Sequence, residues 1–196
     1  RRNSYLKRVE RTYRNITVKV VSCDGGRLPY GIIFRKVFLW SVSQAVRTNS
    51  RTVVFPSEKQ LLQELGLSRN KHNSTLLRDT LRRARNTFLE IDYRPNPERG
   101  TKTTFRGFIY SGAHLQDQDG NQLSLFTSAI QFSEPFWNSI IYQNVLPYPS
   151  AHIKAIKTAT EFDVYLWLRI RLPRIKRGDV VRVPIHQLMD QFGSIE

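Results

Sequence analysis

The sequence predicts an α+β fold, because short stretches rich in β-branched and aromatic residues alternate with longer stretches whose apolar residues recur at helical spacing. Two observations organise the prediction. One is a strand, helix, turn and basic helix between Arg47 and Asn86. The other is a partial repeat of that pattern near the C-terminal end, which predicts a first domain over residues 1–146 and the start of a second over residues 147–196.

The chain opens with a basic stretch, residues 3–14, that we expect to form a short helical lead-in. Alternation over Ile16 to Ser22 predicts a strand, and CDGGRLPYG after it is a turn. The lone Cys23 in that turn cannot form an internal disulfide, so we expect it to be inert. Residues 32–46 are apolar almost all round, which predicts a buried helix beneath the elements that follow.

The helix pair comes next. Thr52 to Phe55 reads as a strand, and Pro56 stops it. Ser57 followed three residues later by Gln60 is a capping-box pattern, so a helix should begin here and end at Gly66, where only glycine enters the left-handed conformation without strain. Its apolar side carries Leu61, Leu62 and Leu65.

A second helix should start at Asn73-Ser74-Thr75 and run to about Asn86. One stripe along it is apolar and consists of Leu77, Leu81, Ala84 and Phe88. The opposite arc and its flanks hold Thr75, Arg78, Asp79, Arg82, Arg83, Arg85 and Asn86. Two helices joined by a turn, the second basic on its outer side, are the outline of a helix-turn-helix, although an arginine-rich face is also common on helices that meet only solvent.

The net charge favours the first interpretation. Lys+Arg 31 against Asp+Glu 16 gives +15, and residues 1–100 carry most of that excess. Such a balance predicts a polyanionic partner, either a nucleic acid or an anionic membrane surface. No apolar run approaches the roughly 18 residues of a membrane span and no signal peptide opens the chain, so we expect a soluble, cytoplasmic protein that does not enter a membrane. Because the chain begins at Arg1 with Met189 as its only methionine, we expect a fragment of a longer protein.

A hairpin is predicted after the basic helix. Phe88 to Tyr93 and Thr103 to Tyr110 read as its strands, placed where a winged helix has its wing, and the tip carries Arg94, Arg99 and Lys102. Charges on a wing would contact phosphates, although an ordinary exposed tip has the same composition. The turn DQDGN and a strand over Gln122 to Phe132 should complete an antiparallel sheet, and Ser133-Glu134-Pro135 should cap a helix through Ile141.

The C-terminal part is predicted to begin a second copy of the same fold. LPYPS is a linker with a domain boundary at about 146–150, followed by a buried helix over Thr160 to Leu172, a strand over Val180 to Val183 and a helix over Ile185 to Phe192 ended by Gly193. QLMDQFG here matches QLLQELG in the first helix of the pair, and an apolar strand ending in proline precedes each. A duplication would place a second winged helix here, truncated before its recognition helix.

The candidate DNA contacts are the polar and basic residues of the helix pair, the hairpin tip and the loop after residue 172. They are Arg69, Lys71, Asn73, Ser74, Thr75, Arg78, Arg82, Arg83, Arg85, Asn86, Arg94, Arg99, Lys102, Arg174, Lys176 and Arg177.

With those residues laid out, the chain resembles the RepA-type plasmid replication initiators. The matching stretches begin at residue 28 and include LPYGIIFRKVFLWSVSQAVRTNSR, LRDTLRRARNTF, DVYLWLRIR and VRVPIHQLMDQFG. SRNKHNS stands where that family tends to have a glycine-rich turn before the recognition helix. The resemblance implies tandem winged helices that bind repeated origin sequences, called iterons, in double-stranded DNA and thereby govern plasmid copy number. It also implies recruitment of host replication proteins, such as a helicase or initiator, and exchange between a homodimer that represses and a monomer that initiates.

The sequence lacks the motifs of the competing enzyme classes. The histidines, at positions 72, 114, 152 and 186, lack the His-x-His spacing of nicking enzymes, and neither GxxxxGK[ST] nor GxSxG occurs. We therefore expect no enzyme activity, no metal and no cofactor. A winged-helix transcriptional repressor remains an alternative, because it would share every feature of the first domain.

Overall fold

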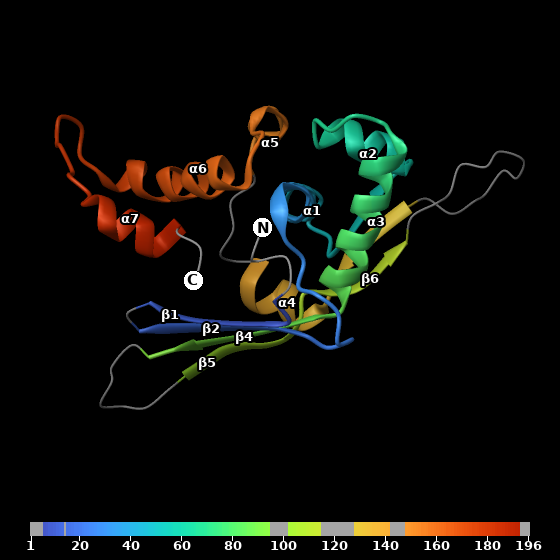
Figure 1. The fold of residues 1–196 in the computed structure, drawn as a ribbon, viewed down its shortest axis with the longest axis horizontal. Helices are drawn as coiled ribbons and strands as arrows, with labels where there is room; N and C mark the ends of the chain where they lie inside the picture. The colour runs from blue at the N-terminus through green and yellow to red at the C-terminus, as the bar shows by residue number, and fades with distance from the viewer. Residues whose placement is uncertain (1–5, 14, 95–101, 115–127, 142–147, 193–196) are drawn as a thin grey trace, which may run out of the picture.

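The computed structural model describes residues 6–13, 15–94, 102–114, 128–141 and 148–192. Its strands are β1 (Arg8–Tyr13), β2 (Ile16–Ser22), β3 (Thr52–Phe55), β4 (Thr87–Tyr93), β5 (Lys102–Phe108), β6 (Tyr110–His114) and β7 (Ser128–Phe132). Its helices are α1 (Gly31–Thr48), α2 (Glu58–Glu64), α3 (Lys71–Arg85), α4 (Glu134–Phe136), α5 (Ser150–Ala155), α6 (Ala159–Arg171) and α7 (Ile185–Phe192), with a π-helix at Trp137–Ile141 and a 3₁₀ turn at Leu172–Arg174. Figure 1 shows α1, α2 and α3 above and beside the strands, and α6 and α7 on the side away from α3.

The first sheet is antiparallel, in the order β1-β2-β4-β5. The helical lead-in expected over residues 3–14 is wrong, because Arg8–Tyr13 is an edge strand whose backbone pairs with β2 from Arg8 opposite Val21 to Tyr13 opposite Ile16. The strand expected at Ile16 to Ser22 is confirmed. Tertiary pairing therefore decides the conformation of a basic segment that has no strong preference of its own.

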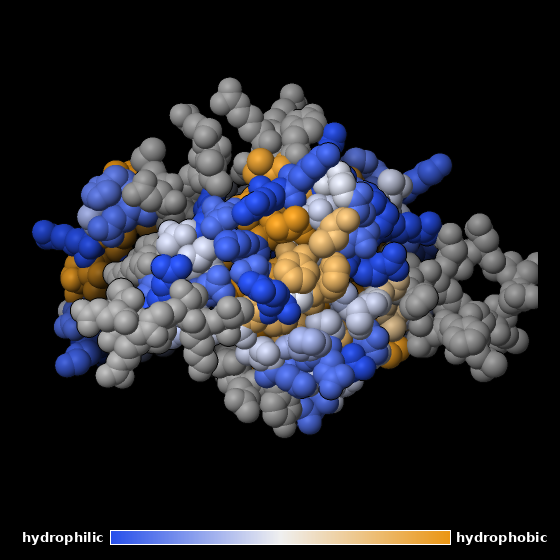
Figure 2. Space-filling view, turned by 90° about the horizontal axis from the view of Figure 1, so that it is seen from below, coloured by the Kyte–Doolittle hydropathy of each residue, from blue (hydrophilic) through white to orange (hydrophobic). Residues whose placement is uncertain are grey.

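The faces of this sheet differ. On the outer face Glu90 of β4 pairs with Arg106 of β5 at 2.8 Å, beside the edge-to-face pair of Phe88 and Phe108. Seen from below, the molecule has an apolar area in its middle surrounded by hydrophilic side chains (Figure 2). On the inner face Phe105 packs into the core against Phe136 of α4. Ser133 caps this helix as expected, but α4 ends at Phe136 and continues to Ile141 as a π-helix.

The second sheet has the order β3-β7-β6. The strand expected over Thr103 to Tyr110 is split, because β5 ends at Phe108 and β6 begins at Tyr110 in the other sheet. The hairpin of β4 and β5 is confirmed. The last strand is confirmed at Ser128–Phe132, while residues 122–127 and the DQDGN turn lie outside the described residues.

A core between the two sheets and the first three helices positions α3. Ala45 of α1, Leu61 and Leu62 of α2, Leu77 of α3 and Ile130 of β7 are fully buried in one cluster. The buried helix expected over residues 32–46 is therefore confirmed as α1, one to two residues longer at each end. Trp40 of α1 meets Phe55 of β3 edge to face, with 5.8 Å between ring centroids. Apolar burial of this extent anchors the whole helix pair.

The turn between α2 and α3 is built as the sequence predicts. The Ser57 hydroxyl accepts a hydrogen bond from the Gln60 N–H, and Gly66 has a φ of +66°. A Cβ at Gly66 would lie 2.7 Å from the Lys154 carbonyl oxygen of α5, a helix that the sequence did not indicate. The buried Lys36 ammonium of α1 donates to the carbonyls of Leu65 and Lys154, so it joins all three segments.

The start of α3 differs from the expectation. Asn70, not the Asn73-Ser74-Thr75 segment, is the N-cap, and its side chain accepts a hydrogen bond of 2.8 Å from the Asn73 N–H. Asn73 lies inside the first turn and donates its side-chain amide to the Ser68 carbonyl. Phe88, expected on the apolar stripe of α3, belongs instead to β4.

The C-terminal part matches the expectation only in its helices. α6 and α7 are confirmed, but the strand expected at Val180 to Val183 is wrong, since no described strand pairs with it and Val180 is 82% exposed. α6 is not a buried helix either, because Phe162 alone of its side chains is buried. Gly193 lies outside the described residues. Arg35 of α1 forms a bidentate ion pair at 2.7 Å with Asp163 of α6. The division at residue 146 stays a prediction.

Candidate nucleic-acid interface

One exposed stripe runs the whole length of α3. Its members recur at spacings of four, three, four and three residues, which places them on one line of a helix, and they are Lys71, Thr75, Arg78, Arg82 and Arg85. The opposite side consists of buried Leu77, Leu81 and Ala84. The apolar stripe predicted from the sequence therefore fixes the rotation of α3, and the four basic side chains of the exposed stripe point away from the core.

The stripe borders a hollow between α3 and β6. This hollow has a volume of about 180 Å³, opens to solvent, and is lined by Arg78, Leu81, Arg82, Arg85 and Ala113. Figure 1 shows α3 and β6 side by side at this place. Three arginines therefore line one concave surface, a geometry that can bring several guanidinium donors to an anion.

Arg78 is attached to the helix below it. Its Nε lies 2.7 Å from a carboxylate oxygen of Glu58, which is buried in the first turn of α2. Arg78 itself is 47% exposed, so it neutralises a buried charge and still presents part of its guanidinium to solvent. The ion pair also ties the two helices of the pair together.

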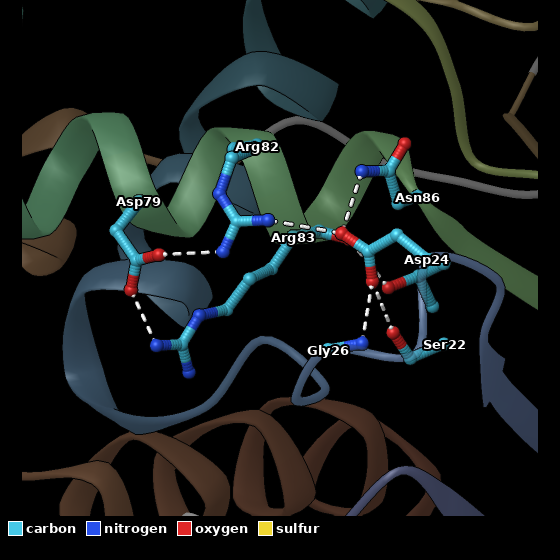
Figure 3. Close-up of polar contacts among 8 residues, drawn as sticks. Ser22, Asp24, Gly26, Asp79, Arg82, Arg83 and Asn86 are labelled. Carbon is cyan, nitrogen blue, oxygen red and sulfur yellow. Dashed lines mark hydrogen bonds and ion pairs between the residues drawn. The ribbon is translucent and has the colours of Figure 1, made fainter.

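Arg82 lies between two carboxylates (Figure 3). Its Nη1 donates to Asp24 at 2.9 Å and its Nη2 donates to Asp79 at 3.0 Å. Asp24 also accepts hydrogen bonds from the Ser22 hydroxyl, the Gly26 N–H and the Asn86 side-chain amide. Hydrogen bonds from Ser22, Gly26 and Asn86, together with the charge of Arg82, lower the pKa of Asp24 to about 2. The carboxylate is therefore ionised at any physiological pH.

Arg83 corrects an expectation, because it does not share the exposed arc. Its side chain is only 13% exposed, lies 2.5 Å from Asp79, and stacks over the Tyr30 ring at 5.2 Å. Its Nε and Nη1 are buried and have no hydrogen-bond partner within the described parts of the chain. Burial raises the pKa of Asp79, but the hydrogen bonds from Arg83 and Arg82 outweigh it and lower that pKa overall. Arg83 therefore packs α3 against the start of α1.

Three members of the stripe remain. The Thr75 hydroxyl donates to the Lys71 carbonyl, and Arg85 is exposed and has no ion pair among the described residues. Three further candidates lie near the stripe: Arg69 is exposed and hydrogen-bonded to Gln63, Ser74 is half-buried, and Asn86 is the C-cap and bonds to Asp24. The contacts of all six with DNA stay predictions.

The other candidates are not brought to α3. Arg94 directly follows β4, a strand that starts at the end of α3 and runs away from it for about 20 Å. Arg99 and the Lys102 side chain lie outside the described residues. The hairpin of β4 and β5 thus belongs to a different sheet from the one that contacts α3. Arg174, Lys176 and Arg177 are exposed in the α6–α7 connection, which Figure 1 shows at the far end from α3.

The acidic residues that hold the arginines are what sequence reasoning missed. Asp24 and Glu58 are 58 and 20 residues from their partners in the chain, so no local spacing indicates them. Asp79 could have been found, because it stands three and four residues before Arg82 and Arg83, the spacing at which helical side chains pair.

A family model described as plasmid encoded RepA protein matches residues 28–184. The chain belongs to this RepA family. The match spans α1 through α6 and includes every residue of the exposed stripe. No curated protein matches the sequence.

Solved structures of RctB share the fold of this RepA family member. A selenomethionine structure of RctB domains 2 and 3 superposes with a TM-score of 0.65 at 12% identity, over 98% of this chain and 72% of that one. A second structure of the same domains gives 0.63 at 13% identity, over 96% and 70%. At this identity the likeness concerns the fold alone. None of the helices described in the RepA chain is long and apolar enough to cross a bilayer.

Proposed function

We propose that this RepA family member binds double-stranded DNA at repeated sequences of a plasmid origin through α3, and that this binding initiates replication. The observation that carries the proposal is the exposed stripe of α3, where four basic side chains follow one line of a helix that the core holds from behind. A helix of this kind fits the major groove, where arginine meets guanine edges and lysine meets phosphates.

The element order supports a winged helix within this proposal. α1, β3, α2 and α3 follow one another, β3 pairs with β7, and β7 pairs in turn with β6, the strand that contacts α3. The hairpin next to the stripe is therefore the one formed by β6 and β7, not the one formed by β4 and β5. A wing beside the recognition helix would come from β6 and β7, which moves the wing from the position that the sequence indicated.

Recruitment of host replication proteins and exchange between monomer and dimer are further parts of the proposal. They rest on membership of the RepA family, and no residue described here is assigned to them. A second DNA-binding helix, expected after α7, likewise rests on membership of the RepA family. The proposal includes no catalytic step, no metal and no cofactor.

Footprinting on the plasmid origin tests the proposed site. We expect protection over direct repeats, because each repeat of the origin presents the same base sequence in the same orientation to α3. Protection of a single inverted repeat in a promoter would instead favour the alternative, a winged-helix repressor that dimerises. An Arg85→Ala protein serves as the matched control, since it should lose protection at every repeat while remaining folded.

A further inference from the structure

Asp24 is one of three carboxylates, with Glu58 and Asp79, that pair with arginines of the exposed stripe. It lies in the turn between β2 and α1, 58 residues before its partner Arg82, and it is the only described residue outside α3 that forms an ion pair with Arg82. A carboxylate beside a surface that binds phosphates weakens that binding through repulsion. We therefore expect Asp24 to contribute something to the site that offsets this repulsion.

The hydrogen bonds of Asp24 indicate that role. One carboxylate oxygen accepts from the Ser22 hydroxyl at 2.8 Å and from the Gly26 N–H at 2.9 Å. The other accepts from Arg82 at 2.9 Å and from the Asn86 amide at 2.8 Å. The first pair anchors the carboxylate to its own turn, and the second pair joins that turn to α3.

The backbone adds a second link at the same place. The Cys23 N–H donates to the Asn86 carbonyl at 2.9 Å, so the turn caps the C-terminal end of α3 and carries Asp24 to within reach of Arg82. The position of the carboxylate is therefore set by the sheet and not by the flexibility of a surface side chain.

Arg82 is held on two sides as a result. Asp24 takes one donor from Nη1 and Asp79 takes one from Nη2, while the side chain stays 53% exposed. A guanidinium has five N–H donors, so donors remain for a base or a phosphate. A side chain already held in one orientation loses less entropy on binding than a free one.

We infer that Asp24 is a specificity-determining residue, which orients Arg82 for a guanine edge while its charge repels the phosphates of any DNA. The inference rests on the proposed function. The two effects have opposite signs: orientation strengthens binding to the cognate sequence alone, and repulsion weakens binding to every sequence.

The test compares Asp24→Asn with the unmodified 196-residue protein on two labelled duplexes. One duplex carries the sequence most enriched from a random pool by the unmodified protein, and the other is a shuffled duplex of the same composition. Loss of one negative charge should raise affinity for the shuffled duplex about two- to fivefold, and loss of orientation should lower affinity for the enriched duplex about tenfold. Glu10→Gln, an equal charge change on the distant edge strand β1, is the control and should leave the ratio of affinities unchanged.

Combining Arg82→Ala with Asp24→Asn gives a double-mutant cycle. Its result distinguishes action of Asp24 through Arg82 from a purely structural role of Asp24. If Asp24 acts through Arg82, Asp24→Asn should no longer change the affinity ratio in the Arg82→Ala background. An equal change on both duplexes, or a ratio change that persists without Arg82, would overturn the inference and leave the proposed function standing. Failure of the unmodified protein to bind any duplex would overturn both, and the thermal unfolding midpoint of each variant shows whether it is folded.

Discussion

Arg83 and Arg85 are two residues apart on α3, yet their surroundings are opposite. Arg83 is mostly buried between Asp79 and the Tyr30 ring, and Arg85 is exposed beside β6. Both were candidates for DNA contact on helical spacing alone. A rotation of 100° per residue separates them, and only the packing of α3 against α1 shows which one turns inward.

Substituting each with alanine should separate stability from binding. Arg83→Ala should lower the free energy of unfolding by about 1–2 kcal/mol, because it removes a charged hydrogen bond and a ring contact. Arg85→Ala should change it by less than about 0.5 kcal/mol and weaken duplex binding. Urea denaturation and fluorescence anisotropy measure the two quantities. A variant of Arg85 that unfolds more easily but binds DNA normally would reverse the assignment.

The ionisation of Asp24 gives a pH prediction. Its pKa is about 2 in the folded chain and 3.8 without the fold, so the charged form is bound more strongly in the folded state. This contribution is complete above the unfolded pKa and is lost as the pH falls from about 4 to about 2. Asp24→Asn should therefore show a shallower loss of stability over that range than the unmodified protein, measured by urea midpoints. Parallel curves for the two proteins would contradict the hydrogen bonds to Asp24.

At the scale of elements, Gly66 is the residue that the α2–α3 turn depends on. In Gly66→Ala the alanine would be strained by the left-handed φ, and its Cβ would lie 2.7 Å from the Lys154 carbonyl oxygen of α5. Gly25→Ala is the matched control, because Gly25 has nearly the same φ, +68°, with open space around it. We expect a loss of about 1–2 kcal/mol at Gly25 and a larger loss at Gly66, measured by thermal or urea unfolding. Equal losses would show that α5 does not contact the turn.

The sequence indicated elements well where local chemistry decides them. The cap at Ser57, the left-handed Gly66, the strand Thr52–Phe55 and the buried helix α1 all follow from short patterns. Local spacing predicts a helix where β1 lies, because the six-residue ladder of β1 with β2 depends on a partner that local spacing does not indicate. Residues 180–183 have strand-forming side chains, but they form no strand because no described strand pairs with them, and Val180, Val181 and Arg182 are exposed.

The candidate site was predictable to a similar degree. The apolar stripe of α3 fixes which side is exposed, and that gave Arg78, Arg82 and Arg85. The acidic residues that hold two of them come from β2–α1 and α2, and the hairpin that flanks them comes from residues beyond 109. These contacts join residues far apart in the sequence, so the spacing of residues within one helix cannot predict them.

At the scale of the whole molecule, the C-terminal segment contributes to the core of the first part. Ile153 of α5 and Phe162 of α6 are fully buried in the same cluster as the leucines of α2. Arg35 and Asp163 join α1 to α6 across 128 residues of sequence. The packing therefore favours a single cooperative unit for α1 to α6, whatever follows α7.

Phe162→Ala tests that cooperativity. Removing a buried phenylalanine should lower the free energy of unfolding by about 3–5 kcal/mol. Tryptophan fluorescence measured in a Trp167→Phe background, which leaves Trp40 in α1 and Trp137 as the reporters, and far-ultraviolet circular dichroism should shift together to lower urea. If the fluorescence transition stayed in place while part of the dichroism signal melted earlier, the C-terminal segment would be a separate domain, as the boundary at residue 146 predicts.

The claim that the exposed stripe of α3 binds duplex DNA has a direct measurement. The salt dependence of duplex binding should be compared between Lys71→Ala/Arg85→Ala and Arg8→Ala/Arg11→Ala, two double variants with the same loss of charge at exposed sites. The first pair lies on the stripe and the second on β1. We predict that the slope of log affinity against log salt falls by about one to two units for the stripe variant and stays nearly unchanged for the β1 variant. Equal slopes for the two variants would contradict the account.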